Sequence, residues 1–205
     1  MIDFYTAGTS NGQRVAIALE ELGLAYTAHK LNLGNGDQKK PEYLAINPAG
    51  MIPAIVDHDG PGGKPLTLAQ SGAIIMYLAE KTGKLLPSDA AKRAVARQWV
   101  MFACSDCAGT SNAIFLASGM LPDKSPANVE FLENRLLRFF RVADEQLKSR
   151  EFLADELSIA DLALYPIYAA RKGIAERAGN LPNITRWGAM MTARPGVVKG
   201  LAASS

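Results

Sequence analysis

The chain has 205 residues, enough for one large domain or two small ones that bury a substantial core. Hydrophobic residues make up 48% of it and charged residues 20%, while 22 basic against 20 acidic side chains leave a net charge of +2. This balance is typical of a soluble globular protein and argues against a surface that binds nucleic acid or a membrane. The two cysteines are too few for a disulfide framework, which favours a reducing compartment, so we expect a cytoplasmic protein.

Neither a membrane-spanning helix nor a secretory leader is expected. Charge-free stretches such as residues 65–79 fall short of the ~18 apolar residues that a spanning helix needs. Asp3 stands where a secretory leader would carry basic residues.

Up to residue 83 the pattern alternates between strand and helix signals. Short apolar runs predict β-strands at residues 2–5, 26–33, 54–57 and 66–68. Helical spacing of apolar residues predicts helices around residues 15–22 and 41–46, and a third that begins at Ser71 and stops at Gly83, a left-handed cap. Glycines and a proline at residues 60–63 predict a hairpin between the last two strands. The order βαβ then ββα predicts one mixed four-stranded sheet in an α/β domain.

The second part of the chain has a different composition. From Ala90 onward alanine and leucine are frequent and strand signals are few, which predicts an all-α domain over residues 90–205. Residues 84–89 would link it to the first domain, residues 1–83. We expect breaks between its helices at Gly109, Gly119, Pro122 and Pro126.

Two segments of the first part are suited to binding a peptide that carries a carboxylate. If the bond between Ile52 and Pro53 is cis, the backbone N–H and C=O of Ile52 turn outward and can pair with an extended peptide. Gln70 and Ser71 open a helix whose first N–H groups lack partners, and the helix dipole favours a carboxylate there. The alternatives are an ordinary trans turn and plain helix capping.

Four segments carry further information through their order and spacing. They are residues 5–14, Asn47-Pro48 ahead of Ile52-Pro53-Ala54, residues 70–74 and residues 158–161. Together they resemble the cytosolic glutathione transferases over nearly the whole chain, and Thr9, Asn11 and Gly12 are most similar to the bacterial Nu-class group of glutathione-dependent disulfide reductases. The resemblance implies a thioredoxin-like first domain that holds glutathione, an all-helical second domain that covers the co-substrate, and a homodimer.

Activation of the glutathione thiol is the chemistry that suits the start of the first helix. A free thiol has a pKa near ~8.5, so at neutral pH most of it is protonated, whereas the thiolate is the nucleophile. Thr9, Ser10 and Asn11 offer hydroxyl, amide and backbone donors that could stabilise the thiolate. Ser10 could instead cap the helix in a capping box with Gln13, and Tyr5 is a further candidate whose place in the strand favours a core role. No cysteine lies there, so glutathione would supply the only sulfur.

The resemblance also implies a role for Gln38, which would contact the glycine end of glutathione. The predicted reaction uses glutathione as co-substrate, and its thiolate attacks a small electrophile or disulfide. Glutathione-dependent disulfide reduction and a non-catalytic binding module are the alternatives. Nu-class relatives place an arginine in the helical domain, and here Arg135 and Arg138 lie in the corresponding stretch without a clear match.

The remaining motifs favour structural roles. Ser158 and Asp161 have the spacing of a capping box, so we expect Asp161 to stabilise the fold. Cys104 and Cys107 have C-x-x-C spacing but lie in the helical half, about one helical turn apart, which favours core or cleft-lining thiols over a redox pair.

A metal site is not predicted. His29 and His58 are the only histidines, and neither has a pattern of metal ligands near it in the sequence.

Overall fold

The computed structural model describes residues 1–204, and these form two compact units. The first is Met1–Leu85 together with the described residues from Ala193 onward, and the second is Leu86–Thr192. The domain bounds suggested by the sequence stay a prediction. The structure groups the last helix with the first unit, because that helix packs along the first one.

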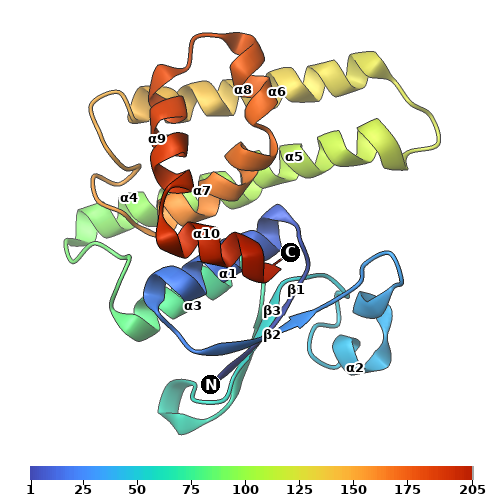
Figure 1. The fold of residues 1–205 in the computed structure, drawn as a ribbon, viewed down its shortest axis with the longest axis vertical. Helices are drawn as coiled ribbons and strands as arrows, with labels where there is room; N and C mark the ends of the chain where they lie inside the picture. The colour runs from blue at the N-terminus through green and yellow to red at the C-terminus, as the bar shows by residue number, and fades with distance from the viewer. Residues whose placement is uncertain (205) are drawn as a thin grey trace. The chain divides into compact units, whose positions relative to one another are not determined.

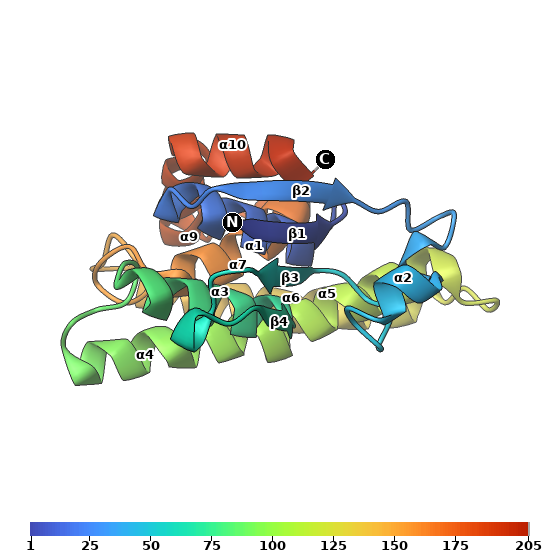
Figure 2. The same ribbon diagram turned by 90° about the horizontal axis from the view of Figure 1, so that it is seen from below.

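The first unit is built on the predicted mixed sheet (Figure 2). Its strands are β1 (Ile2–Thr6), β2 (Tyr26–Lys30), β3 (Ala54–Asp57) and β4 (Leu66–Ala69). In the spatial order β2-β1-β3-β4, β1 and β2 are parallel, whereas β1 with β3 and β3 with β4 are antiparallel. The predicted fold class, a thioredoxin-like α/β domain followed by a helical domain, is confirmed. Only β2 differs clearly in length, since it ends at Lys30 instead of residue 33.

The first unit also contains helices and short turns. They are α1 (Ser10–Leu22), α2 (Pro41–Leu44), α3 (Ser71–Thr82) and α10 (Pro195–Ser204), with the 3-10 turns η1 (Asp37–Lys39) and η2 (Pro61–Gly63). The middle of α1 is buried on all sides, because its residues from Val15 to Leu19 have no exposed surface. As predicted, α3 ends at Gly83, where a φ of 65° forms a left-handed cap.

The packing of α10 on α1 depends on close backbone approach (Figure 1). A Cβ atom at Gly200 would lie only 2.6 Å from the Cα of Ile17, so a larger residue would push the helices apart. Arg194, just before α10, donates through Nε and Nη2 to the two carboxylate oxygens of Glu21, at 2.9 and 2.7 Å. This bidentate pair fixes the start of α10 against the end of α1.

In the described part of the second unit, helices joined by loops are the regular structure, apart from one isolated bridge between Ala154 and Glu156. Its elements are α4 (Ala90–Met101), the π-helical turn η3 (Phe102–Cys107), α5 (Ala108–Phe115), the π-helical turn η4 (Leu116–Met120), α6 (Pro126–Gln146), α7 (Ile159–Ala170), α8 (Lys172–Ala178) and α9 (Pro182–Thr192). Every residue of α7 from Ile159 to Tyr168 is buried, and α7 packs against α4 and α9. The core of this unit therefore lies around α7.

The segment Ala90–Met120 corrects two expectations. It is one continuous helical run of 31 residues, so the predicted breaks at Gly109 and Gly119 are wrong. Glycine inside a helix costs only about 1 kcal/mol relative to alanine, which the packing of the run can offset. By length and composition this run is also long and apolar enough to cross a membrane, contrary to the expectation from the sequence. One face of the run packs against α6 and α7, and 33% of its most apolar window is buried.

The capping box at the start of α7 is confirmed. The Ser158 side chain accepts from the N–H of Ala160 at 3.3 Å, and Asp161 accepts from the N–H of Ser158 at 3.1 Å. Asp161 also accepts from the N–H of Leu153 at 3.1 Å and from Nε1 of Trp187 at 2.9 Å. Burial raises the pKa of this fully buried carboxyl group to about 6. These contacts support the predicted structural role of Asp161.

Candidate functional site

The amino end of α1 is capped by Thr9, not by Ser10 as the capping-box alternative proposed. Thr9 has an extended backbone, with φ −112° and ψ 159°, and its Oγ1 accepts from the N–H of Gly12 at 3.3 Å. Ser10 is already the first residue of the helix. A hydroxyl group that accepts one hydrogen bond still has its own hydrogen to donate. Thr9 can therefore cap α1 and offer an O–H donor at the same place.

Arg14 connects two of the predicted site residues, and sequence reasoning gave it no role. Its side chain is fully buried, and Nη1 donates to Oδ1 of Asn11 at 2.7 Å and to Oγ of Ser71 at 2.6 Å. The predicted thiolate-binding residue on α1 and the predicted carboxylate-binding residue on α3 thus share one nitrogen. The sequence could have indicated a role for Arg14, because an arginine on the buried face of a predicted helix needs polar partners.

The sequence left open that Gln70 and Ser71 only cap the amino end of α3, and the structure shows no side-chain cap there among the described residues. Gln70 occupies the N-cap position with φ 71°, and its side chain makes no capping hydrogen bond. Within the described chain, no side chain accepts from the N–H groups of Ser71, Gly72 or Ala73. Unpaired N–H donors at the positive end of a helix dipole are suited to a carboxylate.

The bond between Ile52 and Pro53 is cis, as the sequence suggested. The carbonyl oxygen of the preceding Met51 accepts from the Tyr43 hydroxyl and from Nδ2 of Asn47, both at 2.6 Å. Tyr43 and Asn47 are buried and fix the backbone just ahead of Ile52. No group among residues 1–204 forms a hydrogen bond with the N–H or C=O of Ile52, so the N–H can donate to a ligand and the C=O can accept from one.

Gln38 lies in η1, on the loop between β2 and α2. Its Nε2 donates to the carbonyl oxygen of Leu33 at 3.4 Å, while its Oε1 is buried and has no hydrogen-bond partner in the described chain. Its neighbour Lys40 is exposed and pairs with Asp37 at 2.7 Å. A buried acceptor without a partner is uncommon and fits a site that is completed by a ligand.

Comparison with known proteins assigns the family. Residues 10–81 match the family described as Glutathione S-transferase, N-terminal domain, and residues 107–195 match Glutathione S-transferase, C-terminal domain. The disulfide-bond oxidoreductase YfcG of Escherichia coli K12 is 35% identical over 98% of this chain and 94% of its own length. The chain belongs to the glutathione transferase family. A second relative in this family, the disulfide-bond oxidoreductase YghU of the same organism, is 34% identical over 97% of this chain and 73% of its own length.

Solved glutathione transferases have the same fold. One from Pseudomonas putida, with one glutathione disulfide bound per subunit, is 37% identical and has a TM-score of 0.90 over 98% of this chain and 90% of its own. One from Burkholderia graminis, with two glutathione molecules bound per subunit, is 38% identical and has a TM-score of 0.92 over 98% of this chain and 87% of its own. The sequence analysis predicted that this chain is most like the Nu-class group, and the two Escherichia coli relatives confirm that likeness.

Both histidines of this chain contact one carboxylate, that of Asp3, and the sequence pattern did not predict this. Nε2 of His29 lies 2.9 Å from one oxygen of Asp3, and Nε2 of His58 lies 2.7 Å from the other. These hydrogen bonds lower the pKa of Asp3. Tyr5 stacks on His29 with ring centroids 4.6 Å apart, so its side chain belongs to this cluster on the sheet. No group of three His, Cys, Asp or Glu side chains in the described chain is arranged to hold a metal ion.

Cys104 and Cys107 both lie in the π-helical turn η3 and form no disulfide. Cys107 is fully buried, as expected of a core thiol, whereas Cys104 is partly exposed. The helical context agrees with the interpretation of these residues as packing thiols.

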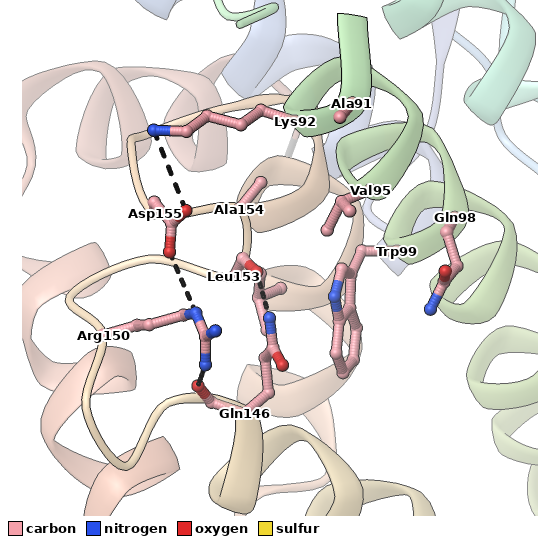
Figure 3. A pocket seen from close by; sticks show the side chains of 10 residues that line it. All are labelled: Ala91, Lys92, Val95, Gln98, Trp99, Gln146, Arg150, Leu153, Ala154 and Asp155. Atoms are coloured by element: carbon pink, nitrogen blue, oxygen red, sulfur yellow. Dashed lines mark hydrogen bonds and ion pairs between the residues drawn. The ribbon is translucent and has the colours of Figure 1, made fainter. Parts of the chain in front are cut away.

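A pocket of about 370 Å³ lies within the second unit and contains none of the predicted site residues (Figure 3). Trp99 forms one wall, and the charged side chains of the pocket pair with one another. Asp155 accepts from Nε of Arg150 at 2.9 Å and lies 3.9 Å from Nζ of Lys92, while Gln146 donates to the carbonyl oxygen of Leu153 at 2.7 Å. Because this pocket contains none of the predicted site residues and its charged side chains are already paired, we place the candidate site on the first unit.

Proposed function

We propose that this protein is a glutathione-dependent disulfide-bond reductase that stabilises the thiolate of bound glutathione with neutral donors. The observation that carries the proposal is the hydrogen bond from Arg14 to Oδ1 of Asn11, 2.7 Å long. It leaves the two hydrogens of the Asn11 amide nitrogen for another acceptor. The hydroxyl of Thr9 adds a second donor, and Ser10 a third at the first position of the helix. Lowering the thiol pKa by two units requires about 2.7 kcal/mol, which a few such donors supply.

Glutathione would bind along the first unit through groups that need an anionic or peptide partner. The amino end of α3, with Gln70 and Ser71, takes a ligand carboxylate. The N–H and C=O of Ile52, beside Pro53, pair with the backbone of the tripeptide, and Gln38 contacts its glycine end. Glutathione is a co-substrate here, and the residues named require no metal.

The proposed reaction has two exchanges. The glutathione thiolate attacks one sulfur of a small disulfide, the S–S bond breaks, and the departing thiolate takes up a proton. A second glutathione thiolate attacks the resulting mixed disulfide, which releases the second thiol and glutathione disulfide. Two glutathione thiols are oxidised and one disulfide is reduced. The names of the Escherichia coli relatives and the glutathione disulfide in the Pseudomonas putida structure support this reaction.

The same thiolate could attack an electrophilic carbon, as in the transferase reaction for which the solved relatives are named. Two parallel assays separate the reactions, one with a small dialkyl disulfide and one with an aryl halide. We expect rapid disulfide reduction and slow aryl transfer. The reverse pattern would assign the transferase reaction. Absence of glutathione binding in calorimetry at millimolar concentration would leave only the non-catalytic module.

The residues are tested by Asn11→Ala and Thr9→Ala, each of which removes one donor to the thiolate. We expect each to raise the thiol pKa by about one unit and so to lower the rate of disulfide reduction about tenfold at a pH below both thiol pKa values, with a smaller loss at neutral pH. Thr67→Ala, at an exposed threonine on β4, is the matched control and should keep the wild-type rate. Wild-type rates in both site variants would remove Thr9 and Asn11 from the mechanism.

A cytoplasmic location and a homodimer belong to the same proposal. Light scattering should give twice the chain mass of 21.9 kDa. A monomer with full activity would separate the reaction from the implied dimer.

A further inference from the structure

Arg14 is more deeply buried than its structural role requires. Its side chain has no exposed surface, although a guanidinium group loses much hydration free energy when it is buried. A well-packed apolar side chain often holds two helices together as well as a buried ionic group does. A guanidinium group at this position therefore suggests a role besides holding α1 to α3.

Both hydrogen bonds of Nη1 are short and have a fixed direction. The two hydrogens on this nitrogen serve Asn11 at 2.7 Å and Ser71 at 2.6 Å, distances typical of charge-assisted bonds. Arginine has donors and no acceptor. Each partner must therefore present an oxygen lone pair to Arg14.

This direction determines what each partner can offer to a ligand. The Asn11 amide has to turn its oxygen toward Arg14, so its NH₂ group points to other acceptors. The Ser71 hydroxyl accepts from Arg14, so its own hydrogen is available for donation. Both remaining donors suit anions, and the proposed ligand has a thiolate for Asn11 and a carboxylate for Ser71.

We propose that Arg14 is a positioning residue that orients the Asn11 amide toward the glutathione sulfur and the Ser71 hydroxyl toward the glutathione carboxylate at the same time. Its positive charge favours both anions. The inference rests on the proposed function, because it assumes that glutathione binds at these two helix ends. It adds that one buried nitrogen couples the thiolate site to the carboxylate site.

The test uses two readouts that a purely structural role would not change. The first is the pKa of the bound glutathione thiol, followed by the ultraviolet absorbance of the thiolate. The second is the Kd of S-methylglutathione, which has the carboxylates but no ionisable thiol. We expect Arg14→Met to raise the thiol pKa by about one unit and to raise the Kd about tenfold. Arg14→Lys, which keeps a charged donor, should restore both in part.

Single-site variants separate the two effects. Asn11→Ala should change the thiol pKa and leave the Kd of S-methylglutathione near the wild-type value, and Ser71→Ala should do the opposite. The matched control is Lys81→Met, because Lys81 also ties α3 to the sheet, through Asp57 at 2.6 Å, away from the site residues. It should lower the melting temperature and leave both readouts unchanged.

The outcomes are distinct. The inference would be overturned if a folded Arg14→Met variant kept the wild-type thiol pKa and the wild-type Kd of S-methylglutathione. The same holds if both changed no more than in Lys81→Met. Either result would leave the proposed function intact. If Arg14→Met does not fold, Arg14→Gln takes its place, because its shorter neutral amide cannot reach both acceptors, and the same criteria apply. Wild-type protein that binds neither glutathione nor S-methylglutathione would overturn the proposed function itself.

Discussion

At the scale of single residues, the site depends on the orientation of one amide group. Asn11→Asp keeps the oxygen that accepts from Arg14 at 2.7 Å but replaces the NH₂ donor with a second acceptor. We expect thermal stability to be kept or increased, since the carboxylate pairs with a guanidinium group. Disulfide reduction should fall at least tenfold, because a carboxylate repels the thiolate and raises its pKa. Asn180→Asp, at an exposed position, makes the same charge change and should be neutral, whereas equal activity in Asn11→Asp would count against the amide as a donor.

At the scale of elements, α3 is fastened to β3 by an ion pair whose carboxylate is buried. Asp57 accepts from Nζ of Lys81 and from the Tyr77 hydroxyl, both at 2.6 Å. Burial alone would raise the pKa of Asp57, but these hydrogen bonds bring it below the ordinary value of 3.8. A lowered pKa in the folded state gives stability that is present above pH ~4 and lost as the pH falls further. Lys81→Met should therefore cost about 1–3 kcal/mol at pH 7 and move acid unfolding, followed by circular dichroism, to higher pH. An unchanged acid transition would show that the pair contributes nothing.

At the scale of the whole molecule, a buried carboxyl group in each unit makes stability depend on pH in opposite senses. Burial raises the pKa of Asp161 to about 6, so the stability from its protonated form is full below pH ~4 and lost as the pH rises to about 6. Asp57 contributes in the opposite direction. Asp161→Asn loses one acceptor but cannot ionise, so urea unfolding should show its deficit relative to wild type shrinking between pH 4 and pH 6. Parallel pH curves for the two proteins would contradict this account.

Local features of the sequence predicted most of the fold. The strands, the cap at Gly83 and the capping box of Ser158 and Asp161 depend on residues that are near one another in the chain, so their patterns are visible without a structure. The capping-box alternative placed the cap of α1 at Ser10, whereas the structure places it one residue earlier, at Thr9. Serine and threonine can both adopt the backbone angles of a cap, so the sequence does not determine which of the two it is.

Contacts between distant residues were not predictable in the same way. The link from Arg14 to Ser71 spans 57 positions, and the meeting of His58 with Asp3 spans 55. Both depend on which strands and helices become neighbours in the fold. The continuous run Ala90–Met120 was missed for another reason, because glycine is an uncertain helix breaker when neighbouring helices supply packing.

The most direct test of the account is a pH titration of the thiol of bound glutathione, followed by the absorbance of the thiolate. We predict a pKa at least one unit below the ~8.5 of a free thiol in the wild type, and a return toward that value in Asn11→Ala. A bound thiol that titrates like free glutathione in the wild-type protein would contradict the claim that Thr9 and Asn11 stabilise the thiolate.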